Sequence, residues 1–359
     1  MHFFDDSLLP ENQQKLVIQV APYGPEWLPS DSDDIPVTMD EQVQKAVDCY
    51  NAGAQLLHIH VRELDGRGSK RMEMFNEMIG RLREAVPEMI LQVGGSISFA
   101  PKDEGEAAKW LDNDTRHLLA DLDPRPDQVT IAINTSQMNI VEMLAKDDYA
   151  GTSFEDPQIY QAYRDMTIPA GPDFYLEHLE RLTASGIQPH FMLGNIAQLE
   201  TVERLIRRGV YTGPLNLNYV GIGGGASGTH PADLIEFARR TPDGAVLTIE
   251  SIMRSTLPMN AIAIALGLHV RVGIEDNLWS PRKERFTSVQ QVEQLVRIAD
   301  ELGRDVATAE EAKQIYRVGQ HWSTADETLD YLGLPPNRHP GQRGVPLRHP
   351  APEAAPALV

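Results

Sequence analysis

The sequence contains a single cysteine, Cys49, among its 359 residues. One cysteine excludes an intramolecular disulfide framework and any zinc site built from pairs of cysteines. Cys49 lies in the run VQKAVDCYNAG, whose apolar residues recur at helical spacing. We therefore expect it to be a buried or half-buried helix residue and not a nucleophile.

Positive charge and long apolar runs are also scarce. The chain has 32 Lys and Arg against 52 Asp and Glu, which gives a formal net charge of −20. Binding nucleic acid requires clustered Lys and Arg, so this balance argues against such a partner. No segment approaches the ~20 apolar residues that span a bilayer, and MHFFDDSLLPENQQK lacks the features of a signal peptide. We expect a cytoplasmic protein that does not bind membranes.

What the sequence does contain is an alternation of short apolar runs with amphipathic stretches, at a hydrophobic content of 42 %. The apolar runs predict strands at 16–24, 56–61, 89–95, 128–134, 188–193, 214–220, 245–250 and 269–275. The amphipathic stretches predict helices at 38–53, 72–86, 104–122, 173–186, 197–209, 231–240, 258–267 and 288–303. In the first helix Thr38 is the expected N-cap, with Glu41 three residues later and Gly53 as its stop.

Eight strand–helix units predict an α/β fold, a single-domain (β/α)8 TIM barrel. The strands are too continuously apolar to leave one face in water, which indicates a parallel sheet covered on its outside. A doubly wound open sheet is the rival, but no GxGxxG loop follows the first strand. We expect an N-terminal extension (1–15), a barrel (16–320) and an extended, Pro- and Arg-rich C-terminal tail (321–359).

The second strand ends in LLHIHVRE, which places His58 and His60 two residues apart. On a strand this spacing points both imidazoles to the same face, and TIM barrels carry their active sites at the C-terminal strand ends. Two histidines on one face are suitable ligands for Zn²⁺ or a similar divalent cation. Two histidines that are hydrogen-bonded separately would show the same spacing.

The eighth strand reads HVRVGIEDNLW and places Arg271 in the barrel interior, where it requires an acidic partner. Glu275 ends this strand and could be a third metal ligand, because the eighth strand closes the barrel near the second. Asp276 points away if the strand continues, but in a turn it could face Arg271. The simpler interpretation of the segment is a structural pair of arginine and carboxylate.

Polar residues after other strands are candidates for binding substrate. Glu26 lies in the loop after the first strand, and Arg254 after the seventh could meet an anion at the rim. Gly95 and Ser96 follow the third strand, where backbone N–H groups could hold a carboxylate. Three side chains that can form hydrogen bonds follow the fourth strand: Asn134, Thr135 and Ser136. Any of these could instead belong to an ordinary turn.

A glycine-rich stretch and a histidine of the fifth strand complete the candidates. The stretch 221–228 suggests a mobile lid or a phosphate-facing loop, but it is not a P-loop because no GK[ST] follows. His190 lies near the N-terminal end of the fifth strand and is expected to be a core residue.

Together, HIHVRELDGR, the GGS turn and HVRVGIEDNLW, followed by a helix and ATAEEAKQIY, resemble the β-keto acid cleavage enzyme family over about residues 16–318. The resemblance implies a Zn²⁺-dependent barrel that condenses a β-keto acid with acetyl-CoA, giving acetoacetate and a shortened acyl-CoA. It implies that the zinc ligands are His58, His60 and Glu275, that Arg271 and Asp276 form a catalytic pair, and that Glu26 contacts substrate. It also implies a homo-oligomer, a dimer or tetramer.

The chain departs from the family pattern at two places. The family's fifth strand usually carries carboxylates in a PExE pattern, where this chain has Pro189-His190-Phe191-Met192. The third-strand turn, usually Thr-Gly-Gly, is here QVGGSIS. The sequence shows no dense basic cluster for the phosphates of CoA, so we expect Lys and Arg from the tail or from a neighbouring subunit to bind them.

Two other functions fit part of the pattern. A metal-dependent hydrolase of the amidohydrolase type also uses HxH on a barrel strand, but on the first strand and with histidines after strands five and six. A metal-stabilised binding barrel would be a non-enzyme, but a closed structural site requires a fourth protein ligand.

Overall fold

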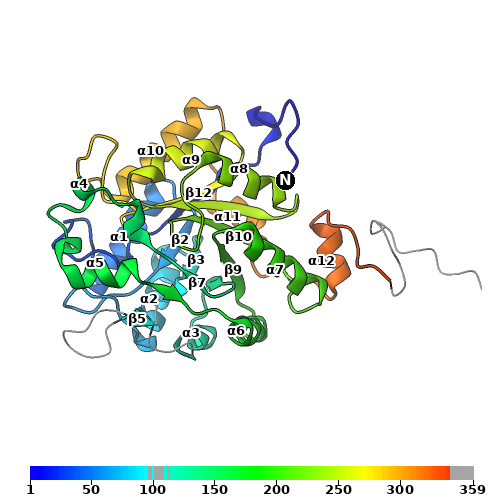
Figure 1. The fold of residues 1–359 in the computed structure, drawn as a ribbon, viewed down its shortest axis with the longest axis horizontal. Helices are drawn as coiled ribbons and strands as arrows, with labels where there is room; N and C mark the ends of the chain where they lie inside the picture. The colour runs from blue at the N-terminus through cyan, green and yellow to red at the C-terminus, as the bar shows by residue number, and fades with distance from the viewer. Residues whose placement is uncertain (96–98, 101–108, 111–113, 340–359) are drawn as a thin grey trace, which may run out of the picture.

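The computed structural model describes residues 1–95, 99–100, 109–110 and 114–339 and shows a closed parallel barrel (Figure 1). Hydrogen bonds join its strands in the order β1-β12-β11-β10-β9-β6-β3-β2. The barrel strands are β1 (Ile18–Val20), β2 (Leu56–Ile59), β3 (Ile90–Val93), β6 (Gln128–Ala132), β9 (Gln188–Leu193), β10 (Asn216–Gly221), β11 (Val246–Ser251) and β12 (His269–Val272). The predicted single-domain (β/α)8 barrel is confirmed, and β1 pairs with both β12 and β2 to close it.

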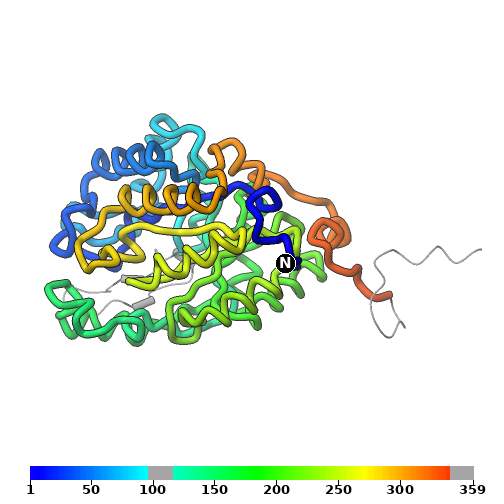
Figure 2. The backbone as a smooth tube through the Cα atoms, turned by 90° about the horizontal axis from the view of Figure 1, so that it is seen from above, coloured from blue at the N-terminus to red at the C-terminus, as the bar shows by residue number. Residues whose placement is uncertain are grey.

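Helices surround the barrel (Figure 2), and their apolar residues pack with those of the strands in one core. Helix α1 begins as predicted, with a capping box between Thr38 and Glu41, and ends at Gly53 in the left-handed conformation. Cys49 is buried on α1. The larger helices are α1 (Met39–Ala52), α2 (Met72–Ala85), α6 (Pro172–Ala184), α7 (Ile196–Arg207), α8 (Pro231–Arg240), α9 (Thr256–Ala265) and α10 (Ser288–Glu301). No helix among the described residues is long and apolar enough to cross a membrane.

The third unit differs from the prediction of one helix over 104–122. Its described part contains a short strand β5 (Lys109–Trp110), which pairs with β4 (Phe99–Ala100), and a single turn of helix α3 (Asp114–His117). The 3₁₀ helix η3 (Leu118–Asp121) follows directly. Gly105 and the Asp-Asn-Asp run at 112–114 are poor residues for a helix interior, so the prediction of a continuous helix was wrong.

Helix α11 (Ala309–Tyr316) closes the N-terminal end of the barrel. Its last residue, Tyr316, is fully buried, and its hydroxyl lies 2.6 Å from the Thr248 hydroxyl on β11. The Tyr316 carbonyl accepts hydrogen bonds from the side-chain amides of Asn216 and Gln188. Because this end is filled, the interior is accessible from the C-terminal ends of the strands.

The insertion after β6 covers part of that open end. Strands β7 (Ser136–Gln137) and β8 (Thr167–Ile168) pair with each other and bring the two ends of the insertion together. Between them lie η4 (Ile140–Met143), α4 (Lys146–Tyr149), η5 (Ser153–Glu155) and α5 (Pro157–Arg164). Phe154 and Tyr163 of this insertion pack in one apolar cluster with Trp27, Leu278 and Trp279, which belong to the loops after β1 and β12.

The C-terminal segment also differs from expectation in its described part. Residues 321–339 were expected to be extended, but they contain helix α12 (Ala325–Tyr331), which packs against α7 (Figure 1). Leu329 and Leu332 are buried, and Arg207 of α7 donates to the carbonyl of Pro335. Two buried leucines one turn apart explain why this segment docks as a helix.

Candidate active site

A cavity of about 130 Å³ opens at the C-terminal ends of the barrel strands. Its charged lining residues lie mainly on one side and come from β2, β11, β12 and the loop after β1. Its other side is formed by methionine and isoleucine side chains from the β7–β8 insertion, β9 and β10. This position is where a (β/α)8 barrel presents its catalytic groups.

His58, His60 and Glu275 meet on the charged side with all three side chains buried. The two Nε2 atoms lie 3.1 Å apart, and Glu275 Oε1 lies 3.4 Å from that of His58 and 3.5 Å from that of His60. Ligand atoms about 2.0–2.1 Å from a tetrahedral metal are about 3.3 Å from one another. The three distances between the candidate ligand atoms therefore fit a tetrahedral divalent metal that has one coordination position left for another ligand.

Gln92 of β3 holds the His58 ring in the orientation that a metal ligand needs. His58 Nδ1 lies 2.7 Å from Gln92 Oε1, which also accepts a hydrogen bond from Gln19 Nε2. A carbonyl oxygen at this position selects the tautomer in which Nδ1 carries the hydrogen and Nε2 presents its lone pair. Burial and the charge of Arg271 lower the pKa of His58 to about 4, which keeps the ring neutral.

Two glycines make room for the cluster. A Cβ atom on Gly94, at the end of β3, would lie 2.2 Å from His60 Cε1, and one on Gly24 would lie 2.0 Å from Glu275 Cγ. Any side chain at these positions would displace a candidate metal ligand. The first glycine of the predicted GGS turn is thus required by the histidine rings packed above it.

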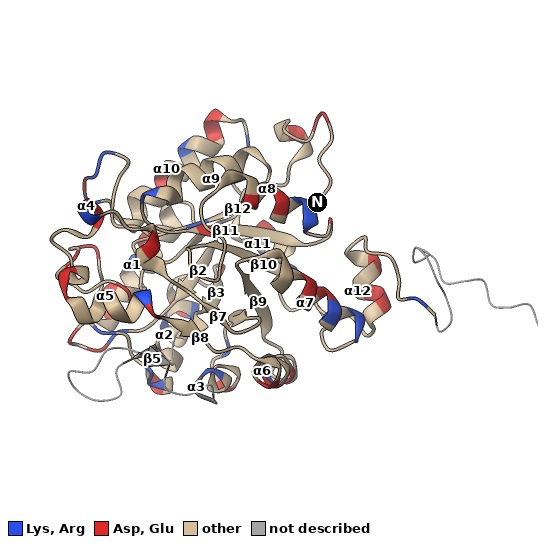
Figure 3. Ribbon diagram, in the orientation of Figure 1, with Lys and Arg blue, Asp and Glu red and all other residues tan. Residues whose placement is uncertain are grey.

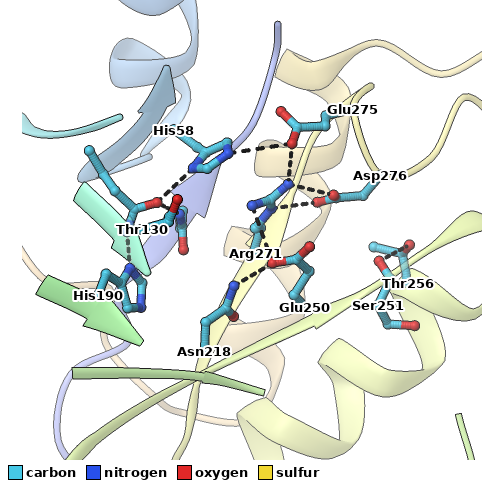
Figure 4. A network of polar contacts seen from close by, with 12 residues as sticks. His58, Thr130, His190, Asn218, Glu250, Ser251, Thr256, Arg271, Glu275 and Asp276 are labelled. Atoms are coloured by element: carbon cyan, nitrogen blue, oxygen red, sulfur yellow. Dashed lines mark hydrogen bonds and ion pairs between the residues drawn. The ribbon is translucent and has the colours of Figure 1, made fainter. Parts of the chain in front are cut away.

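Arg271 lies at the centre of three carboxylates (Figure 4). Its Nε and Nη2 donate to the two oxygens of Asp276 at 3.0 and 2.8 Å, so the pair is bidentate. Nη2 also donates to Glu275 Oε1 at 2.7 Å, and Nη1 lies 3.2 Å from Glu250 Oε2. The chain turns after β12 at Gly273, so Asp276 faces Arg271, which is the second of the two orientations considered above.

The carboxylates of the site differ in the direction in which their pKa values are shifted. Burial raises the pKa of Glu26 well above its usual range, with the Glu275 charge adding to the effect. Burial also raises the pKa of Glu250, and that of Asp276 to about 8, although Arg271 opposes both shifts. Glu275 shows the opposite result: Arg271 and the two histidines outweigh its burial and hold its pKa well below the usual range. The carboxylate whose pKa is lowered, Glu275, is thus the one that lies beside the two histidines, whereas the pKa values of the other three are raised.

The predicted substrate-binding residues separate into two groups. Glu26, Gly95 and Ser136 line the cavity, whereas Ser96 lies outside the described residues. The remaining three contact other parts of the protein: Asn134 Nδ2 donates to Thr201 Oγ1, Thr135 Oγ1 accepts from the Ala170 N–H, and Arg254 pairs with Asp148 at 2.7 Å. Their roles toward substrate stay predictions.

The glycine-rich loop 221–228 uses its backbone N–H groups within the protein. The N–H of Gly224 donates to Glu142 Oε2 at 2.8 Å, that of Gly225 to the Gln137 carbonyl, and that of Ser227 to the Gly194 carbonyl. The first two of these donors fasten the loop to the β7–β8 insertion and the third fastens it to the end of β9, and Ala226 lines the cavity. The loop is therefore part of the cavity wall, and the three N–H groups are already engaged.

Sequence reasoning missed two residues that the structure brings to the site, Glu250 and Gln92. Glu250 ends β11 and accepts a hydrogen bond from Asn218 while it pairs with Arg271. An acidic residue at the C-terminal end of an apolar barrel strand was a usable signal for Glu250. Gln92, in the middle of an apolar strand, was a signal of the same kind.

The amidohydrolase-type alternative does not match this arrangement. His190 on β9 is buried beside Gln92 and does not line the cavity, and β10 contains no histidine. As predicted, His190 is a core residue, and burial lowers its pKa to about 3.

Comparisons with known proteins find relatives over most of the chain. A family model described as beta-keto acid cleavage enzyme matches residues 15–318. The chain is 28 % identical to a 3-keto-5-aminohexanoate cleavage enzyme of Acetoanaerobium sticklandii, over 86 % of this chain and 100 % of that protein. It is 26 % identical to a 3,5-dioxohexanoate:acetyl-CoA acetone transferase of Paraburkholderia graminis, over 85 % of this chain and 96 % of that protein.

Among solved structures, apo ObcA superposes with a TM-score of 0.58 at 15 % identity. The match covers 80 % of this chain and 66 % of ObcA, so the chain spans slightly less than two thirds of that protein. At this identity the likeness shows the barrel fold alone.

Proposed function

Because the chain belongs to the beta-keto acid cleavage enzyme family, we propose that it is a carbon–carbon bond-cleaving acyltransferase that uses acetyl-CoA. A β-keto acid R–CO–CH₂–COO⁻ reacts with acetyl-CoA and gives acetoacetate and R–CO–CoA. The proposed enzyme uses a divalent cation as its cofactor, and Zn²⁺ is the first candidate. The observation that carries the proposal is one cavity that holds the His58–His60–Glu275 cluster beside the Arg271–Asp276 pair.

A cation held by His58, His60 and Glu275 would supply Lewis-acid activation of a keto group. The proton on C2 of the β-keto acid then needs a base, and Asp276 is the carboxylate that the bidentate contact with Arg271 orients. Its raised pKa, about 8, suits a group that takes and returns a proton near neutral pH. We assign proton removal to Asp276 and its positioning to Arg271.

Formation and cleavage of the carbon–carbon bonds then require that the substrate is held in place and that water is excluded. The deprotonated C2 attacks the acetyl carbonyl of acetyl-CoA, and the CoA thiolate released attacks the original keto carbon, which frees acetoacetate. The Gly95 backbone and the Ser136 hydroxyl line the cavity where they can hold the substrate carboxylate. The apolar wall opposite keeps water from the activated carbon.

The same wall favours a particular substituent R. It is built from aliphatic and thioether side chains: Met138, Met166, Ile168, Met192 and Ile222. A cation on this side is Arg116, whose guanidinium stacks 3.5 Å from the centre of the Phe174 ring. An ammonium group placed here would meet a like charge and lose its hydration, so we propose that R carries no positive charge and contacts this wall through alkyl carbons.

The test is a direct assay. The purified protein is incubated with Zn²⁺, acetyl-CoA and a panel of β-keto acids with alkyl, cationic and anionic substituents, and acetoacetate is measured. Turnover of at least one substrate supports the proposed reaction, and highest kcat/KM for alkyl substituents supports the proposed substituent. Absence of acetoacetate across all three classes refutes the proposed function.

The proposal includes a cytoplasmic, homo-oligomeric enzyme, a dimer or tetramer. Light scattering on the eluting peak of a sizing column measures the mass of the particle, and a mass of one 39.9 kDa chain would contradict the oligomer.

A further inference from the structure

A short hairpin after β12 carries three cations at the rim of the barrel. Backbone hydrogen bonds from Ser280 N–H to the Glu284 carbonyl (2.8 Å) and from Phe286 N–H to the Leu278 carbonyl (3.0 Å) build it. Its tip exposes Arg282, Lys283 and Arg285. This rim hairpin (Trp279–Phe286) is a defined structure, because its Trp279 end is buried and fixed to Asn277 by two hydrogen bonds.

The cations of the rim hairpin have no acidic partner within the described part of the chain, unlike many of the arginines on the outer helices. No carboxylate of the described residues forms an ion pair with Arg282, Lys283 or Arg285. By contrast, Arg81 and Arg181 on the outer helices each pair with a glutamate four residues away. Glu284 lies among them, so the tip 282–285 carries a net charge of +2 in a chain with a net charge of −20, which is a local reversal of sign (Figure 3).

The rim hairpin stands next to the active-site cavity. Met253 and Asp276 line that cavity, while the residues that follow them, Arg254 and Asn277, line a second cavity of about 230 Å³ together with Trp279 of the hairpin. The Met253 N–H donates to the Asp276 carbonyl at 2.7 Å, which joins the two segments. The two cavities are thus separated only by the backbone of these two segments, and Asp276, the proposed base, lies close to the rim hairpin.

We propose that the rim hairpin binds the phosphate groups of the CoA co-substrate through Arg282, Lys283 and Arg285. This inference rests on the proposed function, since it assigns a site to acetyl-CoA. In a CoA thioester the phosphates and the reactive thioester lie at opposite ends of a long arm. The phosphates must therefore bind outside a cavity of about 130 Å³ that holds the reacting carbons.

The chemistry of the hairpin fits this ligand. Arginine forms bidentate hydrogen bonds with phosphate, and lysine adds a point charge. The Arg285 guanidinium lies 5.2 Å from the centre of the Trp279 ring, which restrains it at the rim. The site lies within the barrel chain itself, so phosphate binding does not require cations from the C-terminal tail or from a neighbouring subunit.

The test compares two acyl donors. In the variant Arg282→Gln/Lys283→Gln/Arg285→Gln we expect KM for acetyl-CoA to rise roughly 10- to 100-fold, with kcat and the KM for the β-keto acid near wild type. Acetyl-pantetheine carries the same thioester without the nucleotide phosphates, so wild type and variant should use it equally well. Raising the salt concentration should weaken acetyl-CoA use by wild type more than by the variant.

The matched control removes three cations from the opposite end of the barrel. Arg208, Arg239 and Arg240 lie at the C-terminal ends of α7 and α8, and their replacement by glutamine should leave KM for acetyl-CoA unchanged. The inference is overturned if the hairpin variant keeps the wild-type KM for acetyl-CoA, or if its activity with acetyl-pantetheine falls to the same extent.

Calorimetric titration with CoA separates this inference from the proposed reaction. Binding to wild type that the hairpin variant loses supports the phosphate site even when no β-keto acid is turned over. Equal binding to both proteins contradicts the site while leaving the reaction untouched.

Discussion

Replacing Arg271 by lysine separates the charge of this side chain from its shape. The guanidinium makes four ionic contacts of 2.7–3.2 Å to Glu250, Glu275 and Asp276. A lysine ammonium keeps the charge that these buried carboxylates require, but it cannot reproduce the two-pronged contact that orients Asp276. Arg271→Lys is therefore a better test than removal of the charge, which would leave three buried carboxylates without a cation and cost about 3–5 kcal/mol of folding stability.

The size of the effect follows from the hydrogen bonds that a lysine cannot make. One ammonium group can retain about half of the four interactions, so two charge-assisted hydrogen bonds disappear at about 1.5–3 kcal/mol each. If about 3 kcal/mol of this free energy is expressed in the positioning of Asp276, kcat/KM falls roughly 100-fold. The acetoacetate assay measures this fall, and urea denaturation measures the accompanying decrease in stability.

Arg304→Lys is the matched control. Arg304 is also buried, and its guanidinium makes four hydrogen bonds of 2.7–3.0 Å, but all go to backbone carbonyls at the closed end of the barrel. This control should lose similar stability while kcat/KM stays within twofold of wild type. The reasoning is refuted if Arg271→Lys keeps wild-type kcat/KM, or if the control loses activity to the same extent.

Three further predictions concern the metal, the substituent and acid. Gln92→Leu removes the acceptor that orients His58 and should weaken Zn²⁺ binding about 10- to 100-fold, as competition with a chelator measures. Met192→Glu, in the apolar wall, should lower kcat/KM for alkyl β-keto acids at least about 10-fold and raise it for cationic ones. Burial lowers the pKa of His178 and of His269 to about 3, so the unfolded chain takes up protons below pH 6.5 while the folded one does not. Stability should thus fall as the pH drops from 6.5 toward 3, by about 2 kcal/mol for each histidine at pH 5 in urea denaturation.

Each of the three has an outcome that would contradict it. Gln188→Leu removes a glutamine that contacts the closed end of the barrel and should leave Zn²⁺ affinity unchanged; equally weakened binding in both variants would contradict the role of Gln92. An unaltered substrate ranking in Met192→Glu would contradict the proposed alkyl site. His269 Nδ1 accepts a hydrogen bond from the Val17 N–H, so His269→Gln should flatten the pH dependence of stability between pH 7 and 5. An unchanged slope would contradict this assignment.

Much of the fold could be predicted because its signals are local. Each barrel strand is a short, continuously apolar run, and helix α1 carries its own start and stop in Thr38, Glu41 and Gly53. The prediction of one helix over 104–122 failed. The apolar residues of this segment recur at helical spacing, but Gly105 and the Asp-Asn-Asp run at 112–114 have low helix propensity. The spacing of apolar residues alone does not show whether residues of low helix propensity will interrupt a helix.

The candidate site likewise has a part that could be predicted from the sequence and a part that could not. The sequence by itself determined that His58 and His60 share a face, because side chains alternate along a strand, and it placed Arg271 inside the barrel for the same reason. Only the tertiary structure decided that Asp276 turns back onto Arg271 after Gly273, that Glu250 joins them from β11, and that Arg254 meets Asp148. These outcomes depend on turn geometry and on contacts between segments far apart in the chain. A strand's own spacing fixes which residues face inward, and the closure of the barrel fixes which of those residues meet.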